Sequence, residues 1–161
     1  MIIVSDTSCI SNLFQIDALH LLQKLFGKII IPNAVFQELI VFHKISFKEQ
    51  LDNHSVEIVQ VIDAALLEKV KKFDLDTGET EAIALALQFK NVALIIDEIA
   101  GKRTAEQLGI KTVGLLGVIL LAKEQNIIAA AKPLFDNLKS KTTFHFSASL
   151  YNKLLQLANE Q

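Results

Sequence analysis

Two aspartates follow short apolar stretches that are typical of buried strands. Asp6 lies two residues after Ile2–Val4, and Asp97 directly follows Ala93–Ile96. Because the carboxyl ends of parallel strands meet at one edge of a sheet, we expect both carboxylates at the edge where such sheets bind ligands. A single Asp after a strand is more often a turn former or a helix cap. Two at the same edge favour a binding site.

Glutamates near two predicted helix starts are further candidates. Asn33 follows an apolar run and can cap a helix, which directs the Glu38 side chain back toward the helix start. In the segment 74–86, turn residues give way to an Ala- and Leu-rich helix that carries Glu79 and Glu81 near its start. Acidic residues in a first turn also favour the helix dipole without having any function.

Two choices between neighbouring acids stay open. Glu79 and Glu81 are two residues apart on a helix, so they face about 200° away from each other and only one can point into a pocket. We predict Glu79, because it adjoins Gly78 at the helix start. For the last acid we predict Asp97 rather than Glu98, because it is nearer the strand end and shorter.

Converging carboxylates repel one another unless a cation offsets their charge. Without His or Cys beside them, oxygen ligands favour Mg²⁺ or Mn²⁺ over zinc. Such an ion lowers the pKa of a bound water, orients it for attack on a phosphodiester and stabilises the leaving oxygen. The set Asp6, Glu38, Glu79 and Asp97 therefore predicts metal-assisted hydrolysis of phosphodiesters.

Composition narrows the classes of function. The 161 residues, 51% of them apolar, suffice for one compact domain. Cys9 alone excludes an intramolecular disulfide and a thiolate zinc site, and the four histidines lack the spacing of metal ligands. The net charge of -2 argues against nucleic-acid binding through a bulk positive field, although it allows a nuclease with a local basic rim.

Neither a membrane span nor a secretion signal is predicted. Every apolar run is far shorter than the ~20 residues that cross a bilayer. The N-terminus begins with the strand-like Ile2–Val4 and lacks the features of a signal peptide. We therefore expect a cytoplasmic protein with no membrane partner.

Short β-branched runs alternate with amphipathic stretches along most of the chain. The runs are too short for helices and predict strands at 2–4, 29–31, 56–61, 92–96 and 112–113. Between them, Leu, Ile and Ala at helical spacing predict helices at 11–26, 34–41, 64–73, 78–89 and 101–108. This alternation predicts an α/β fold, a three-layer α/β/α sandwich with a central parallel sheet.

The C-terminal third has a different, mostly helical pattern. Helices are predicted at 115–123, 127–138 and 150–160, and a short extended segment at 142–146. Either Ser147 or Ser149 can cap the last helix.

Four motifs in order resemble those of a PIN domain. They are Asp6-Thr7-Ser8, Phe36-Gln37-Glu38-Leu39, Gly78-Glu79-Thr80-Glu81-Ala82-Ile83-Ala84-Leu85-Ala86, and Ile96-Asp97-Glu98 followed by Arg103-Thr104-Ala105. Together with the Gly114–Gly117 segment, they look most like the prokaryotic VapC-like branch. The resemblance covers residues 1 to about 125 of a single PIN-like domain spanning 1–161, and the helices from about 126 onward are less diagnostic.

This resemblance implies a metal-dependent endoribonuclease, the toxin of a toxin–antitoxin pair. Its partners would be an RNA substrate and an antitoxin protein, and the high apolar fraction suits a homodimer as well as a well-filled core. By analogy, Asp6 and Asp97 hold Mg²⁺ or Mn²⁺ directly, while Glu38 and Glu79 bind it through water or orient the attacking water. Thr7 or Ser8 would hydrogen-bond a ligating carboxylate.

One alternative of a different class stays open, namely a PIN-like module that binds protein or RNA with little or no nuclease activity. Other α/β enzymes fit poorly. A haloacid-dehalogenase-like phosphatase needs a second Asp where Ser8 stands, and a receiver domain needs an early acidic pair. The glycine motifs of dinucleotide-binding and P-loop proteins are absent from the sequence.

Overall fold

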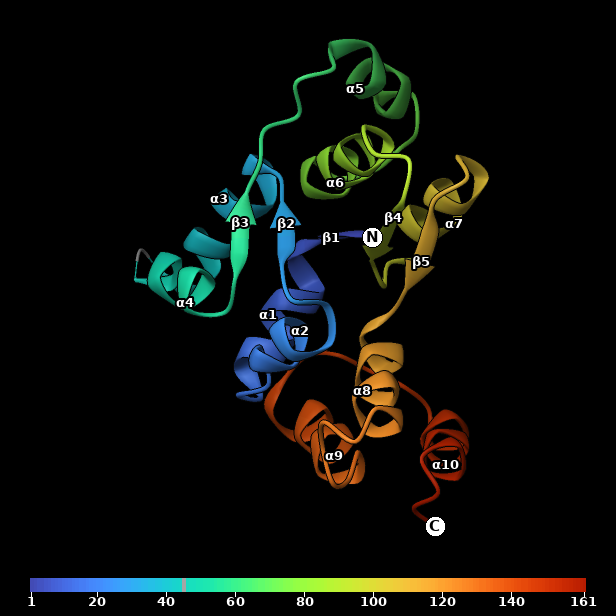
Figure 1. Ribbon diagram of the computed structural model, residues 1–161. Coiled ribbons are helices and arrows are strands. Elements are labelled where there is room, and N and C mark those ends of the chain that lie inside the picture. The colour runs from blue at the N-terminus through green and yellow to red at the C-terminus, as the bar shows by residue number, and fades with distance from the viewer. Residues whose placement is uncertain (45) are drawn as a thin grey trace.

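The computed structural model describes residues 1–44 and 46–161. At its centre, five parallel strands form a sheet with the order β3-β2-β1-β4-β5 (Figure 1). The strands are β1 (Ile2–Ser5), β2 (Ile29–Ile31), β3 (Val56–Ile58), β4 (Val92–Ile95) and β5 (Lys111–Val113). The five predicted strands are confirmed, although β3 and β4 end earlier than predicted.

The strand order reverses next to β1. Val4 of β1 pairs with Ile30 of β2 on one side and with Leu94 of β4 on the other. The chain thus runs outward from β1 to β3 and then returns to the opposite side of β1. Such a reversal opens a crevice beyond the carboxyl ends of the two central strands, where α/β proteins bind ligands. Here those two strands are β1 and β4, which precede Asp6 and Asp97.

Helices cover both faces of the sheet. They are α1 (Thr7–Gln15), α2 (His20–Phe26), α3 (Asn33–His43), α4 (Phe47–Asn53), α5 (Ala64–Lys71), α6 (Thr77–Leu87), α7 (Ile99–Gln107), α8 (Leu115–Glu124), α9 (Lys132–Lys141) and α10 (Ala148–Leu157). Helix α6 packs on β1 and β4, whereas α1, α2 and α8 lie across the strands from it (Figure 1). The predicted three-layer α/β/α architecture is therefore confirmed. No helix in the described part of the chain is long and apolar enough to cross a membrane.

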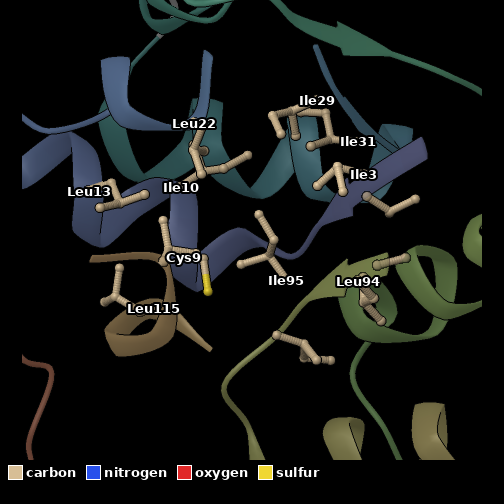
Figure 2. Close-up of a cluster of buried hydrophobic side chains, with 14 of the residues drawn as sticks. Ile3, Cys9, Ile10, Leu13, Leu22, Ile29, Ile31, Leu94, Ile95 and Leu115 are labelled. Atoms are coloured by element: carbon tan, nitrogen blue, oxygen red, sulfur yellow. The ribbon is translucent and has the colours of Figure 1, made fainter. Parts of the chain in front are cut away.

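The hydrophobic core explains why the strands are apolar without alternation. Both faces of a parallel sheet are covered by helices, so successive side chains are buried on either side. Val4, Ile31, Leu94 and Ile95 are fully buried. Figure 2 shows side chains of β1, β2 and β4 meeting those of α1, α2 and Leu115 of α8. This packing fixes the strand ends that carry the acidic residues.

The helix predicted at 11–26 is wrong in its extent, since the structure forms α1 and α2 instead. Asp17 has a φ of 56°, a left-handed conformation that ends α1. The Ala18 N–H donates to the Leu13 carbonyl over 2.8 Å, which closes the turn as at a typical helix C-terminus. Helix α1 begins at Thr7, and the side chain of the preceding residue, Asp6, caps it.

Other element boundaries also differ from the prediction. Helix α4 was not predicted, and its buried Phe47 and Leu51 supply the apolar contact that forms it. The helix predicted at 127–138 begins only at Lys132, because the chain turns at Asn126, whose φ is 59°. The segment 142–146 forms no strand. Ser147 caps α10 by accepting from the Leu150 N–H at 3.0 Å.

Candidate functional site

A cavity of about 390 Å³ is lined by loops and helices around the end of β1. Five carboxylates line it: Asp6, Glu38, Asp76, Glu79 and Glu98. The remaining lining residues are polar or aromatic: Thr7, Ser8, Ser11, Asn12, Gln15, Phe42 and Thr143. Three of the four predicted site residues are thus brought to one cavity.

Asp6 is held at the junction of β1 and α1. One carboxylate oxygen, Oδ1, accepts from the Cys9 N–H at 3.1 Å, and Oδ2 accepts from the Ser8 hydroxyl at 3.2 Å. The residue is only 3% exposed. Burial raises the pKa of Asp6 from 3.8 to about 7, and the nearby charge of Asp97 adds to the rise. A cation in the cavity would reverse this effect by stabilising the ionised form.

Glu38 connects three helices. Its Oε1 accepts from the Gly78 N–H at the start of α6 over 3.1 Å, and its Oε2 accepts from the Thr7 hydroxyl of α1. A Cβ atom at position 78 would lie 2.6 Å from Glu38 Oε2, so a larger residue there would displace the Glu38 carboxylate from this position. The carboxylate is consequently fixed in one orientation at the cavity wall.

Glu79 and Glu81 have separate tasks. Glu79 lines the cavity, where its Oε2 accepts from the Asp76 N–H at 3.4 Å. Glu81 instead accepts from the Ala34 N–H at 2.9 Å and so caps α3. The expectation that Asn33 caps this helix is wrong, because Asn33 is the first helical residue and Glu81 supplies the acceptor.

The second oxygen of the Glu79 carboxylate, Oε1, is buried and has no hydrogen-bond partner among the described residues. Burial raises the pKa of Glu79, and the charge of Asp76 contributes to the rise. A buried carboxylate oxygen without a partner is costly, which makes Glu79 a candidate ligand for a cation. This oxygen is packed against Gly101 of α7, where a Cβ atom would lie 3.0 Å from it.

Asp97 lies beside Asp6 but does not line the cavity, whereas its neighbour Glu98 does. Its Oδ1 accepts from the Leu115 N–H at the start of α8 over 3.0 Å, and its Oδ2 accepts from the Cys9 thiol at 2.9 Å. Burial raises the pKa of Asp97. Cys9 therefore stands between the two aspartates, and burial beside them raises its own thiol pKa well above the usual value.

The lining residues match the chemistry of a hard divalent cation. All of the acidic donors are oxygens, and Glu79 Oε1 is a buried acceptor without a hydrogen-bond partner among the described residues. Across residues 1–44 and 46–161, no group of three or more His, Cys, Asp and Glu side chains is arranged to hold a metal ion. Mg²⁺ typically keeps several waters and uses only one or two carboxylates, so a hydrated ion fits these residues.

Comparison with known proteins agrees with this fold. A family model described as a PIN domain (DUF3368) matches residues 2–160. The chain belongs to the PIN-domain family. The solved structure of a PilT N-terminus domain protein from the hyperthermophilic archaeon Sulfolobus solfataricus P2 is similar, with a TM-score of 0.53 and 18% identity. The similarity covers 91% of this PIN domain and 98% of that chain, and it supports the fold. Curated proteins give no match.

Several residues in the cavity of this PIN domain, or next to it, were not predicted from the sequence. Asp76 forms a capping box with Glu79, a pattern that the Asp-x-x-Glu spacing could have revealed. Cys9 lies three residues after Asp6, so it follows one helical turn later on α1. Phe42 lies four residues after Glu38 and therefore on the same side of α3. The last two depend on which helix faces the site, which the sequence does not state.

Proposed function

We propose that this PIN-domain protein is a metal-dependent endoribonuclease and the toxin of a toxin–antitoxin pair. The observation that carries the proposal is one cavity lined by Asp6, Glu38 and Glu79, with an unpartnered buried oxygen on Glu79. Acids placed so close destabilise one another unless a cation binds. The resemblance to the VapC-like branch supplies the RNA substrate and the antitoxin as further parts of the proposal.

Asp6 and Glu79 are the residues that would hold Mg²⁺ or Mn²⁺, with Asp97 or Glu98 from the end of β4. When bound, such an ion supplies charge neutralisation at the scissile phosphate and a more acidic water. Ser8 and Cys9 keep the two aspartates oriented through the hydrogen bonds described above. These hydrogen bonds hold the two aspartate carboxylates at the carboxyl edge of the sheet.

Glu38 is proposed to orient the attacking water and to take up its proton. Its carboxylate is fixed by the Gly78 N–H and the Thr7 hydroxyl, so it presents a constant position to the cavity. A positioned carboxylate at hydrogen-bond distance from a nucleophile typically accelerates a reaction about 10²–10⁴-fold. Neutralising Glu38 should therefore reduce cleavage without removing metal binding.

The decisive experiment is a cleavage assay on structured and single-stranded RNA with Mg²⁺ or Mn²⁺. Wild type is compared with Asp6→Asn and Asp97→Asn, and Glu124→Gln, an exposed acid at the end of α8, serves as the control. We expect metal-dependent cleavage that both aspartate variants lose and the control retains. If wild type cleaves no RNA and calorimetry detects no metal binding, the binding-module alternative replaces the nuclease.

The antitoxin is tested separately. Expression of wild type should arrest growth, and co-expression of the protein encoded next to it should restore growth by binding this chain. Asp6→Asn should leave that binding intact while removing the toxicity. Light scattering of the purified chain would at the same time report whether it forms the homodimer that its apolar composition suits.

A further inference from the structure

An exposed aromatic ring stands at the rim of the acidic cavity. Phe42 lies near the end of α3, and 71% of it is exposed. It lines the cavity together with Asp6 and Glu38, and it also lines an adjoining, almost wholly apolar hollow with Val41 and Thr7. Phe42 is therefore continuous with the candidate active site, unlike the isolated exposed apolar residues elsewhere on the described surface.

The Phe42 ring is backed by a set of aromatic contacts. Its centroid lies 5.2 Å from that of His43 in an edge-on arrangement. The His43 ring stacks at 4.7 Å on the buried Phe47 and meets the Phe14 ring edge-on at 5.0 Å. Its Nε2 atom is 2.7 Å from the Ser11 hydroxyl, another cavity residue. These contacts hold the His43 ring in place behind the Phe42 ring.

The exposed Phe42 ring beside five carboxylates offers RNA a contact that does not depend on charge. The acids repel the RNA backbone, so affinity must come partly from groups that do not depend on charge. Aromatic stacking is such a contribution, because every nucleobase has a π face. Asn12, Gln15 and Thr143 line the same cavity and offer hydrogen bonds to the edge of a base.

We propose that Phe42 is a stacking platform for an unpaired nucleobase next to the scissile phosphate, which selects single-stranded RNA. The inference rests on the proposed ribonuclease function. A base within a duplex is already stacked on both sides, whereas an unpaired base can leave its neighbours and lie on the ring. A protein partner such as the proposed antitoxin is the rival occupant of this patch, and the leucine variant below separates the two.

The test compares Phe42→Ala, Phe42→Leu and Phe42→Tyr. Cleavage is measured as kcat/KM on a single-stranded RNA and on the same sequence in a duplex. Binding of the labelled single strand is followed by fluorescence anisotropy in an Asp6→Asn background, which does not cleave. Leu157→Ala, at an apolar site on α10 that is 61% exposed, is the control, and thermal melting verifies that each variant folds.

We expect Phe42→Ala to lose about tenfold or more in affinity and kcat/KM for the single strand, Phe42→Leu to lose nearly as much, and Phe42→Tyr to resemble wild type. The residual activity on the duplex should change little. The proposal is overturned if alanine leaves the single strand unaffected. It is equally overturned if leucine restores wild-type behaviour, since that result indicates a plain apolar contact such as a protein interface.

The two hypotheses fail in different ways. If wild type cleaves RNA and Phe42→Ala cleaves it equally well, the stacking platform is rejected and the nuclease stands. If wild type cleaves no RNA but Phe42→Ala weakens binding of the single strand, the nuclease is rejected and the platform stands as part of an RNA-binding module.

Discussion

At the scale of single residues, burial favours the protonated form of three acids of the site, Asp6, Glu79 and Asp97. Asp6 is almost fully buried, with the charge of Asp97 close by, and its pKa is raised to about 7. The thiol of Cys9 stays protonated and donates to Asp97. Burying the Asp6 carboxyl therefore lowers the free energy of unfolding near neutral pH, as is common where stability is exchanged for function.

The raised pKa of Asp6 makes the stability of the fold depend on pH. Between about pH 4 and pH 7 the folded state keeps the Asp6 proton that the unfolded state loses, so stability falls as the pH rises through this window. The rise from 3.8 to about 7 corresponds to at most roughly 4 kcal/mol of unfolding free energy. In metal-free buffer, urea unfolding should show this loss for wild type and a smaller one for Asp6→Asn.

The comparison with Asp6→Asn isolates the residue, because Glu79 and Asp97 have raised pKa values and are common to both proteins. The variant should also be more stable than wild type near neutral pH, although it is inactive. Identical pH slopes for the two proteins would contradict the burial of a protonated Asp6.

At the scale of elements, α6 positions α3 and with it Glu38. Two hydrogen bonds link the packed helices: Glu81 accepts from the Ala34 N–H, and the Gly78 N–H donates to Glu38. The N-terminal part of α6 therefore caps α3 through Glu81, and through the Gly78 N–H it orients the Glu38 carboxylate that α3 carries. Of the two glutamates in this motif, Glu81 thus has a structural role and Glu79 stays available at the cavity.

Paired substitutions separate these tasks. Glu81→Ala should lower the unfolding free energy by about 1 kcal/mol, as for the loss of a helix cap, and keep most of the cleavage activity below its melting temperature. Glu79→Gln should lose activity while stability stays equal or rises, since it removes a buried charge without a partner. Denaturant unfolding and RNA cleavage measured on both variants check this, and the reverse pattern would assign the site to Glu81.

At the scale of the whole molecule, a metal ion that binds only the folded state must stabilise the entire domain. The site draws on Asp6 between β1 and α1 and on residues of α1, α3 and α6, which come together only on folding. An unfolded chain has these acids far apart. Binding is therefore linked to global unfolding.

We expect Mn²⁺ and Mg²⁺ to raise the melting temperature in proportion to the logarithm of their concentration. At a hundred times the Kd, the gain is about 2.7 kcal/mol. Asp6→Asn should abolish this response, whereas the control Glu124→Gln should keep it. Thermal melting with and without the ions measures the effect, and an equal response from Asp6→Asn would place the ion elsewhere on the surface.

The pattern of short apolar runs and amphipathic stretches was enough for the fold class, the five strands and the edge at which acids gather. The reason is that a parallel sheet buried on both faces demands such runs, and its strands must all end at one side. The boundaries were less predictable. Asp17 ends α1 through a left-handed conformation, and α4 forms because Phe47 and Leu51 find buried positions, neither of which local periodicity reports.

Tertiary packing alone decided which acids share the cavity. The sequence favoured Glu79 over Glu81 only through its place beside Gly78, whereas the position of α3 beside α6 makes Glu81 a cap and leaves Glu79 at the cavity. Likewise, the start of α8 binds Asp97 through the Leu115 N–H and leaves Glu98 at the cavity wall. Phe42 joins the site for the same reason. Side-chain direction depends on contacts between elements far apart in the chain, and these contacts exist only in the folded molecule.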